Sequence, residues 1–357
     1  MKKALQLSVK GRGDVHPNPM VGAVIVKNGE IIGEGYHEKF GRAHAELNAI
    51  SDAGDDAAGS TLYVTLEPCV HHGKTPPCVD AVFQAGIARV VVGMVDPNPQ
   101  VMGKGINYMR TKGIEVTENV LENECKELNF GYIKFITTGK PFLTLKIAQT
   151  LDGRIATSTG HSKWVTSRSS RHAAHRLRAR HNAIMIGIGT LLTDDPLLTV
   201  RYANGISPVR IILDSKLRVP LDAKLLISDE LAPKTIFICT EQASKEKIAR
   251  IEEKGATVEI LPHDEKGWVT WEALLEYLKT LGITSVLIEG GNTVQTSCMR
   301  SGHADRIAVF IAPKILGSGI DAIGDLGIRN INSAIQLVNV KIRRIKEDLL
   351  FIADFEK

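Results

Sequence analysis

The chain has few cysteines, and they lack the spacing of a disulfide framework. They are Cys69, Cys78, Cys125, Cys239 and Cys298, five in 357 residues. An odd number without regular spacing is typical of reduced thiols, so we expect a cytoplasmic protein and not a disulfide-rich secreted one. The amino-terminal segment has two lysines but no apolar run long enough for a signal peptide. No stretch approaches the length of a membrane helix, so no membrane partner is expected.

An excess of charge of one sign is also missing. The formal net charge is +4, with 24% charged and 43% hydrophobic residues. This mild excess is too small to indicate nucleic-acid binding by itself, but it suits an anionic small substrate. The sequence has no internal repeat, and no G-x-G-x-x-G precedes an expected helix, so a Rossmann dinucleotide domain is not supported. Length and composition together suggest a globular protein of two domains.

A histidine and two cysteines in the first half have the pattern of a zinc site. H-A-E begins at His44, E-P-C ends at Cys69, and P-P-C ends at Cys78. One imidazole and two thiolates leave the fourth position of a zinc ion for water, which the metal activates. Glu46 is not needed as a ligand, so we expect it to shuttle protons. H-x-E followed by P-C-x-x-C is typical of zinc-dependent base deaminases.

The two cysteines are farther apart than in that signature. Eight residues separate them in place of two. We still expect both to bind the metal, because Pro77 predicts that Cys78 begins a helix. A closed structural zinc site is the alternative, with His71 or His72 as a fourth ligand. The catalytic interpretation is favoured, because a structural site leaves Glu46 without a role.

Alternating strand-like and helix-like segments predict an α/β protein. In the first half we expect a sheet with helices on both faces, completed by a single helix over residues 121–136. A glycine and a proline in residues 137–141 predict a linker. The domains are therefore expected at residues 1–140 and 141–357. The second half then restarts with apolar, strand-like runs.

Two features of the second half suggest binding of phosphate or nucleic acid. E-G-G-N-T, at residues 289–293, joins an apolar run to an expected helix start, where free backbone N–H groups bind phosphate. A Gly-Gly turn that serves only packing is the alternative. Residues 168–181 contain five arginines and no acid. We interpret this segment either as a solvated basic face or as an RNA-binding helix.

The motifs resemble one family over the whole chain. They are P-N-P-M-V-G-A-V-I-V, H-A-E, Y-V-T-L-E-P-C, H-H-G-K-T-P-P-C, D-P-N-P, A-Q-T-L-D-G-R-I-A, S-K-W-V-T-S, G-T-L-L-T-D-D-P-L-L-T-V-R and I-E-G-G. A chain with these motifs in this order resembles the RibD family of bifunctional riboflavin biosynthesis proteins. The resemblance implies a cytidine-deaminase-like zinc domain followed by a dihydrofolate-reductase-like domain that binds NADPH. The eight-residue gap between the cysteines is what this family shows.

The resemblance also implies site residues. His44, Cys69 and Cys78 match the ligands of one zinc ion and Glu46 the proton shuttle, and the implied deaminase substrate residues are Asn18, His37, Lys74, Asp96 and Asn98. The implied NADPH residues are Ala148, Trp164, Thr190, Asp194, Ser215, Gly291, Asn292, Thr293, Val294, Gln295, Thr296 and Ser297. The implied reductase substrate residues are Ser162, Arg178, Leu198, Arg201 and Glu289. Of these, Arg178 and Arg201 suit a phosphate monoester, because guanidinium groups grip phosphate bidentately.

The implied activities are two successive reactions on phosphorylated pyrimidines. The first is the zinc-dependent hydrolytic deamination of 2,5-diamino-6-(5-phosphoribosylamino)pyrimidin-4(3H)-one. The second is the NADPH-dependent reduction of the ribosyl chain of 5-amino-6-(5-phosphoribosylamino)uracil to ribityl. NADPH is expected over NADH, with Arg168 and Arg171 as basic surroundings. We expect these small molecules as partners and no nucleic acid, with a homo-oligomer as a further option.

Two other classes of protein are alternatives. One is a tRNA or nucleic-acid deaminase whose second domain binds RNA through the arginine-rich segment. In that class the D-D-P and E-G-G motifs have no role. The other is a non-enzymatic protein with a relic zinc site. The intact Glu46 beside three intact ligands argues against it.

Overall fold

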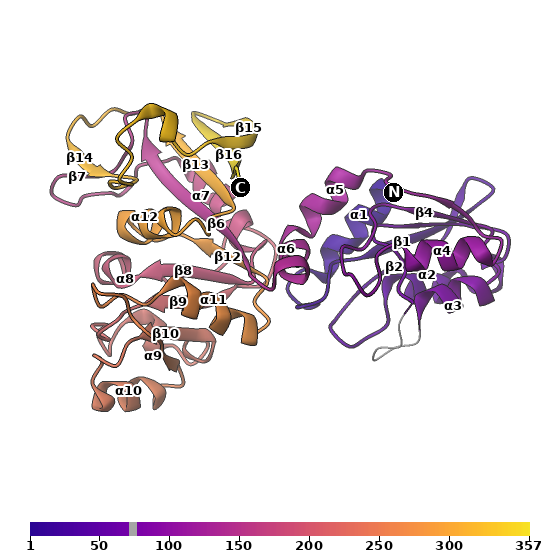
Figure 1. Ribbon diagram of the computed structural model, residues 1–357, viewed down its shortest axis with the longest axis horizontal. Coiled ribbons are helices and arrows are strands. Elements are labelled where there is room, and N and C mark those ends of the chain that lie inside the picture. The colour runs from indigo at the N-terminus through magenta and orange to yellow at the C-terminus, as the bar shows by residue number, and fades with distance from the viewer. Residues whose placement is uncertain (71–76) are drawn as a thin grey trace. The chain divides into compact units, whose positions relative to one another are not determined.

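The computed structural model describes residues 1–70 and 77–357 and has two compact units, Met1–Lys140 and Pro141–Lys357 (Figure 1). Each unit has its own sheet and its own apolar core. All five cysteines are free thiols. Within the described residues, no helix has both the length and the apolar character needed to cross a membrane.

The first unit is built on a mixed sheet with the strand order β2-β1-β3-β4-β5. β1 pairs antiparallel with β2 and β3, whereas β3, β4 and β5 run parallel. The strands are β1 (Gly22–Lys27), β2 (Glu30–Tyr36), β3 (Thr61–Val64), β4 (Arg89–Val92) and β5 (Glu115–Thr117). The helices are α1 (Lys2–Ser8), α2 (Ala45–Ala53), α3 (Cys78–Gln84), α4 (Lys104–Thr111), α5 (Glu122–Leu128) and α6 (Phe130–Thr138), with short 3₁₀ turns at Val9–Gly11 and Gly54–Ala57.

Helices cover both faces of this sheet, as expected. Ala23 and Ile25 of β1 belong to the core formed with α2, α3 and α4, whereas Val24 between them packs with α1. This alternation follows from the two-residue period of a strand. A Cβ at Gly35 of β2 would clash with the carbonyl oxygen of Ala45. Glycine therefore lets α2, which carries the H-A-E motif, lie directly against the sheet.

Residues 121–136, expected as a single helix, form two helices. Asn129, between α5 and α6, has φ −111° and ψ 24°. Its side chain accepts a hydrogen bond from the backbone N–H of Met20 and donates one to the carbonyl of Met20, both at 2.9 Å. This contact with a distant segment explains the break, which an apolar pattern does not reveal. α6 ends at Thr138 and is followed by Gly139 with φ 71°, so the irregular connection is shorter than expected.

The second unit is built on a larger sheet with the strand order β11-β10-β9-β8-β12-β6-β13-β16-β15. The strands from β11 to β13 in this order run parallel, and β16 and β15 add antiparallel strands at one edge. The strands are β6 (Phe142–Thr150), β8 (Ala183–Gly187), β9 (Val209–Leu213), β10 (Thr235–Cys239), β11 (Thr257–Ile260), β12 (Ser285–Ile288), β13 (Arg306–Ala312), β15 (Leu337–Ile345) and β16 (Asp348–Phe355). A separate pair joins β7 (Arg154–Thr157) to β14 (Gly319–Asp321).

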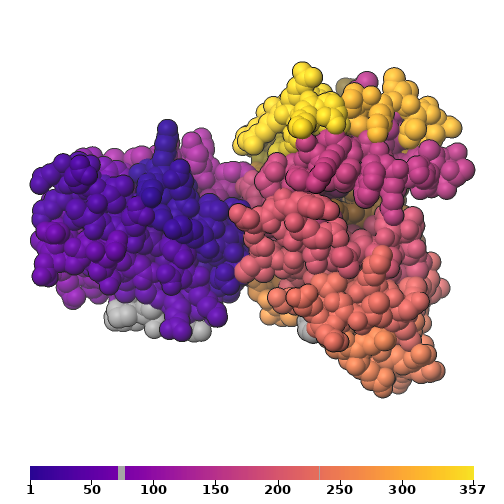
Figure 2. All heavy atoms as spheres, turned by 180° about the vertical axis from the view of Figure 1, so that it is seen from behind, coloured from indigo at the N-terminus to yellow at the C-terminus, as the bar shows by residue number. Residues whose placement is uncertain are grey.

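Helices also cover both faces of the second sheet. They are α7 (Arg168–Arg178), α8 (Ile188–Asp194), α9 (Lys224–Ile227), α10 (Lys245–Glu252), α11 (Trp271–Thr280) and α12 (Asn292–Arg300), with 3₁₀ turns at Ala232–Lys234 and Ile331–Ser333. α11 and α12 pack on one face, and α7 to α10 pack on the other. In the space-filling view the yellow C-terminal strands lie against the magenta atoms around α7 (Figure 2). There Asp348 accepts hydrogen bonds from the backbone of Ser167 and the hydroxyl of Ser170.

Candidate active sites

Three chain segments of the first unit bring the expected zinc ligands together. His44 immediately precedes α2, Cys69 follows β3, and Cys78 is the first residue of α3, as Pro77 predicts. The ligand atoms of the three side chains lie within 4.8 Å of one another. The Nδ1 atom of His44 is 3.1 Å from the sulfur of Cys78 and 3.6 Å from that of Cys69.

The His44–Cys69 separation matches a tetrahedral zinc ion, and the His44–Cys78 separation is slightly shorter than such an ion requires. Zinc bonds of about 2.3 Å to sulfur and about 2.0 Å to nitrogen place neighbouring ligand atoms about 3.5–3.8 Å apart. A hydrogen bond from the Cys78 thiol lowers the pKa of Cys69 well below its usual value. Cys69 is therefore readily available as the thiolate that binds metal. The alternative fourth ligands, His71 and His72, lie outside the described residues.

Glu46 is buried beside this ligand set. It lies in the first turn of α2 and is 3% exposed. Burial raises the pKa of its carboxyl to about 7. A carboxyl with a pKa near neutrality both accepts and returns a proton easily. The geometry is thus suited to the proton shuttle that the H-x-E spacing predicts.

A cavity of about 350 Å³ adjoins the ligand set, and His44, Glu46 and Cys69 form part of its wall. Three of the implied substrate residues also line it: Asn18, Asp96 and Asn98. The carboxylate of Asp96 accepts a hydrogen bond from the backbone N–H of Asn98 at 2.9 Å, which orders this loop. Lys74, another implied substrate residue, lies outside the described residues.

His37 lies behind the cavity wall and does not line it. Its side chain is 2% exposed, and its Nε2 atom is 3.4 Å from the amide nitrogen of Asn18. Its ring also meets the ring of His44 edge-on, with 5.3 Å between the ring centres. Burial lowers the pKa of His37, which favours the neutral ring. His37 therefore contacts Asn18 and His44 from behind the cavity wall.

Residues that no motif identifies complete the wall of this cavity. Tyr132, Phe135 and Ile136 come from one face of α6, and Phe40 comes from the loop before α2. The hydroxyl of Tyr132 donates a hydrogen bond to Asp96 at 2.9 Å. The only sequence signal is the helical spacing of these side chains, which is equally typical of an ordinary core helix.

A cavity of about 890 Å³ lies in the second unit where β6, β8 and β12 end. Among the implied NADPH residues it is lined by Ala148, Trp164, Thr190, Asp194 and residues 291–295. It is also lined by all the implied substrate residues, Ser162, Arg178, Leu198, Arg201 and Glu289. Open α/β sheets bind their ligands at the carboxyl ends of the strands. One cavity thus brings together residues expected to hold cofactor and substrate.

Three implied NADPH residues do not line this cavity. The hydroxyl of Ser297 accepts a hydrogen bond from the indole of Trp271, and that of Thr296 accepts one from the backbone of Gly324. Ser215 follows β9 and lies outside the lining residues. A helix presents only part of its circumference to one cavity, which explains why the continuous run 291–297 divides between two surroundings.

Arg178 is paired within the cavity wall. Its Nε and Nη2 atoms donate hydrogen bonds to the two carboxylate oxygens of Glu289 at 2.6 and 3.0 Å, and Nη1 donates to the carbonyl of Thr199. The ammonium of Lys146 is 3.5 Å from the same carboxylate. Burial alone would raise the pKa of Glu289, but Arg178 and Lys146 outweigh it and hold the pKa at about 2. The guanidinium fork of Arg178 therefore contacts the protein, which differs from the expected grip on a phosphate.

Arg201 has a more open environment than Arg178. Its backbone N–H donates to the Nδ1 atom of His175 at 3.0 Å, while its guanidinium lies 5.9 Å from the ring centre of Tyr202. Within residues 1–70 and 77–357, no carboxylate pairs with this guanidinium. Burial, with Arg178 and Arg201 nearby, lowers the pKa of His175 to about 4. His175 is therefore neutral and free to accept the hydrogen bond that fixes the Arg201 backbone.

Sequence reasoning did not identify Lys146 or His175 as site residues. A lysine inside the apolar strand F-L-T-L-K-I-A is a signal for Lys146, because lysine is almost never buried without a partner. His175 belongs to the arginine-rich segment, which forms α7 from Arg168 to Arg178. The structure does not support an entirely solvated basic face or an entirely RNA-binding helix. One side of the helix packs on the sheet and lines the cavity.

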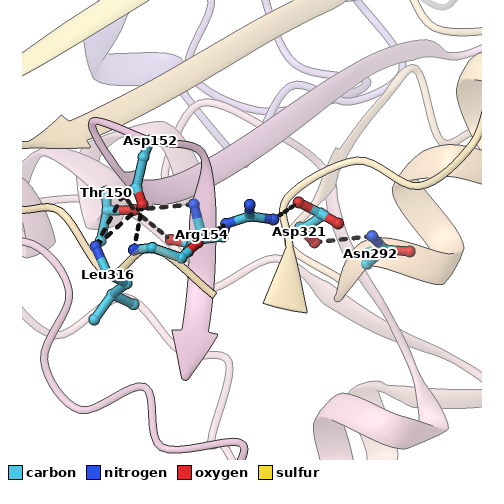
Figure 3. A network of polar contacts seen from close by, with 7 residues as sticks. Thr150, Asp152, Arg154, Asn292, Leu316 and Asp321 are labelled. Carbon is cyan, nitrogen blue, oxygen red and sulfur yellow. Dashed lines mark hydrogen bonds and ion pairs between the residues drawn. The ribbon is translucent and has the colours of Figure 1, made fainter. Parts of the chain in front are cut away.

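A polar network holds the β7–β14 pair beside the start of α12 (Figure 3). The carboxylate of Asp152 accepts hydrogen bonds from the hydroxyl of Thr150 and from the backbone of Leu316. Arg154 pairs with Asp321, whose carbonyl accepts a hydrogen bond from the amide of Asn292 at 2.8 Å. The network therefore connects the end of β6 to the first residue of α12, at the wall of the larger cavity.

The two sites define the class of the protein: an α/β enzyme with a zinc-dependent deaminase site in one unit and a reductase cavity in the other. Residues 1–94 match the family described as the cytidine and deoxycytidylate deaminase zinc-binding region, and residues 141–351 match the RibD C-terminal domain. The RibD protein of Aquifex aeolicus is 50% identical, covering 98% of this chain and 96% of the relative. That of Escherichia coli K12 is 39% identical, with the same coverage of both chains.

Solved structures agree over the full length. Acinetobacter baumannii RibD matches with a TM-score of 0.87 at 34% identity, covering 100% of this chain and 98% of that one. The diaminohydroxyphosphoribosylaminopyrimidine deaminase/5-amino-6-(5-phosphoribosylamino)uracil reductase of Thermotoga maritima matches with a TM-score of 0.84 at 38% identity, covering 100% and 97%. The chain belongs to the RibD family, and it is a bifunctional deaminase and reductase of riboflavin biosynthesis. The expected fold pair and the expected cofactors, zinc and NADPH, are confirmed, and the tRNA deaminase is not favoured.

Proposed function

We propose that residues 1–140 catalyse the deamination and residues 141–357 the reduction. The substrates are the phosphoribosylaminopyrimidine and its deaminated uracil product that the sequence resemblance implies, and the name of the Thermotoga maritima relative supports them. The observation that carries this assignment is the placement of His44, Cys69, Cys78 and Glu46 around one cavity of the first unit. The second cavity, with its paired Arg178 and Glu289, lies entirely within the other unit.

In the first unit, His44, Cys69 and Cys78 hold zinc. Zinc bound there supplies an activated water molecule as the nucleophile for the amino-bearing carbon of the pyrimidine. Glu46 accepts the proton of this water and returns it to the leaving amine, as its burial beside Cys78 and its pKa near neutrality support. The carboxylate of Asp96, which faces the same cavity, accepts hydrogen bonds from donors of the substrate.

In the second unit, the start of α12 holds the cofactor. NADPH supplies the hydride that converts C1 of the ring-opened ribose into the ribityl chain. The hydroxyl of Thr190 accepts a hydrogen bond from the backbone of Gly291 at 3.0 Å and so orders the turn before the helix. Free N–H groups at the amino end of a helix bind phosphate groups, which supports residues 291–293 as contacts for the pyrophosphate.

The substrate phosphate and the reacting ribose bind against the wall of the cavity that α7 and β6 form. Arg201 binds the phosphate, because its guanidinium has no carboxylate partner within the described residues. Arg178 instead holds Glu289 ionised, as the low pKa of Glu289 supports. Opening the ribose ring requires a proton at the ring oxygen. We assign this proton to the ammonium of Lys146, which lies beside Glu289 in the cavity wall.

The site chemistry also supports the proposed partners and compartment. We place the protein in the cytoplasm, with phosphorylated pyrimidines as partners and no nucleic acid. Five free thiols, two of them zinc ligands in this proposal, are compatible with a reducing compartment. The arginines of α7 that line a cavity, Arg171 and Arg178, are part of the wall of a small-molecule site.

Selective removal of zinc tests the division between the two units. We expect a chelator to abolish ammonia release from the diaminopyrimidine substrate. The same treated sample should still oxidise NADPH, followed by absorbance, when it is given the deaminated substrate. Adding zinc back restores ammonia release if the loss is specific. Loss of both reactions on chelation, in protein that stays folded by circular dichroism, would contradict the proposal.

A further inference from the structure

Glu67, the acid of the E-P-C motif, is buried and has no cationic partner within residues 1–70 and 77–357. Its side chain is 3% exposed. One carboxylate oxygen accepts hydrogen bonds from the backbone N–H groups of Asp96 and Gly103 at 3.1 and 2.9 Å. The other accepts them from Gly105 and Ile106 at 2.8 and 3.2 Å. A buried carboxylate is costly unless its oxygens are satisfied, and these four donors satisfy them.

The donors come from the loop that lines the deaminase cavity and from the start of the helix that follows this loop. Gly103, Gly105 and Ile106 lie at the start of α4, whose positive end favours a carboxylate. Asp96 lies in the loop between β4 and α4 and lines the cavity. The backbone N–H of Glu67 also donates to the carbonyl of Met94 just before this loop. Glu67 therefore joins both ends of the loop to the segment after β3 that carries Cys69, one of the zinc ligands.

The contact leaves no room for a side chain on the facing helix. A Cβ at Gly105 would clash with the carbonyl oxygen of Pro68 and would lie 3.1 Å from a carboxylate oxygen of Glu67. α4 therefore begins as close to the E-P-C turn as a backbone allows. Such packing fixes the position of the loop relative to Cys69, two residues after Glu67.

Asp96 is held from a second direction by Tyr132. The hydroxyl of Tyr132 donates to the same oxygen of Asp96 that accepts the backbone N–H of Asn98. Glu67 thus fixes the backbone of Asp96, and Tyr132 fixes its carboxylate. Both residues also line the cavity.

We infer that Glu67 is a positioning residue for deamination, which sets Asp96 and Asn98 at the correct distance from the zinc ligands and Glu46. The inference rests on the proposed assignment of Asp96 to the substrate. Glu67 acts through the backbone of the loop and not on the reacting atoms. Loosening it should weaken the hold on substrate more than the chemical step.

Glu67→Gln in the full-length protein tests this directly. The substitution keeps the size but replaces an accepting oxygen by an amide that faces N–H donors. We expect zinc content and reductase activity to stay at the wild-type level, while the KM for deamination rises about tenfold or more and kcat falls less. If Glu67→Gln does not fold, Glu67→Asp, which keeps the charge but withdraws it from the donors, carries the same expectation. An unchanged KM, or a fall in kcat alone, would overturn the inference.

A double-mutant cycle separates positioning from general support of the fold. Tyr132→Phe removes only the hydroxyl that contacts Asp96, so we expect the KM effects of Glu67→Gln and Tyr132→Phe to be non-additive. Tyr108→Phe is the matched control, because Tyr108 also donates to an aspartate, Asp80, but does not line the cavity. The inference would be contradicted if the fold-changes in KM of the two single variants simply multiply in the double variant. It would also be contradicted if Tyr108→Phe raises KM as much as Tyr132→Phe does.

A failure of the inference can be told from a failure of the proposed site. Asp96→Asn tests the substrate role of Asp96 itself. A raised KM in Asp96→Asn with a normal KM in Glu67→Gln would reject the positioning role of Glu67 and leave the site assignment intact. A normal KM in Asp96→Asn would reject the assignment of Asp96, and with it the premise of the inference.

Discussion

Arg178 and Glu289 form a bidentate ion pair in the wall of the reductase cavity, with Nε of Arg178 2.6 Å from one carboxylate oxygen and Nη2 3.0 Å from the other. Both side chains are largely buried. The pair connects α7 to the end of β12, the two elements between which the substrate is proposed to bind. In the proposed site its first role is therefore to shape and charge the cavity wall, and phosphate binding is proposed for Arg201.

Arg178→Ala is expected to weaken both the second unit and its reaction. Removing one partner of a buried ion pair leaves an uncompensated charge and typically costs about 3–5 kcal/mol of stability. We expect a lower unfolding midpoint, a raised KM for the uracil substrate, and unchanged ammonia release. Arg306→Ala is the control, because it breaks an ion pair with Asp354 in the same sheet away from the cavity. A KM effect as large in Arg306→Ala would show that lost stability, and not the site, causes the change.

The preference for NADPH over NADH is expected to depend on Arg171 and not on Arg168. Arg171 lines the cavity and lies 4.3 Å from the ring centre of Trp164, whereas Arg168 is exposed and does not line it. A guanidinium at the cavity attracts the additional phosphate of NADPH. Arg171→Ala should therefore lower the ratio of kcat/KM with NADPH to kcat/KM with NADH. Arg168→Ala should leave this ratio unchanged. An unchanged ratio in Arg171→Ala would rule out this role.

His181 is expected to make the second unit less stable in mild acid. Its ring is buried between Thr144 and the carbonyl of Leu177, and burial lowers its pKa from 6.5 to about 4. Between these values the unfolded chain binds a proton that the folded chain does not. Stability therefore falls as the pH drops from 6.5 towards 4 and levels off below. Between pH 7 and pH 5, protonation of His181 in the unfolded chain lowers the free energy of unfolding by about 2 kcal/mol.

Tryptophan fluorescence measures this effect in the correct unit, because Trp164, Trp268 and Trp271 all lie beyond residue 140. Urea unfolding at pH 7 and pH 5 should show a smaller pH-dependent loss for His181→Gln than for the wild type. Equal losses in both proteins would mean that His181 does not contribute. The comparison is needed because His175, with a pKa also lowered to about 4, adds to the loss in the wild type.

Local spacing explains why the zinc site could be predicted from the sequence. His44 and Glu46 lie at the start of one helix, where two residues of separation decide their relative position. Cys78 follows a proline that predicts a helix start, and the structure begins α3 there. Short-range geometry of this kind depends little on the rest of the fold. The family resemblance then extended the prediction to the second unit.

Contacts between distant segments explain what could not be predicted. Arg178 and Glu289 are 111 residues apart, so only the assembled sheet shows that they pair. Tyr132 reaches Asp96 across 36 residues, and its place in an amphipathic helix resembles that of any core residue. Asn129 breaks the expected helix through a contact with Met20. Each of these depends on register and packing, which no local pattern contains.

The central claim is that two separate sites catalyse the two reactions, and Glu46→Gln tests it most directly. The substitution keeps the size of the side chain and leaves His44, Cys69 and Cys78 in place, so zinc should stay bound at about one ion per chain. It removes the carboxylate that moves protons, a role typically worth a factor of about 10² to 10⁴ in rate. We therefore expect ammonia release to fall by that factor.

Reduction should persist in the same preparation, because every residue proposed for it lies beyond residue 140. The measurement is ammonia release from the diaminopyrimidine and NADPH oxidation with the deaminated substrate, both on folded, zinc-loaded Glu46→Gln protein. The account predicts that the first collapses while the second keeps its wild-type rate. Loss of both reactions in that protein would contradict it.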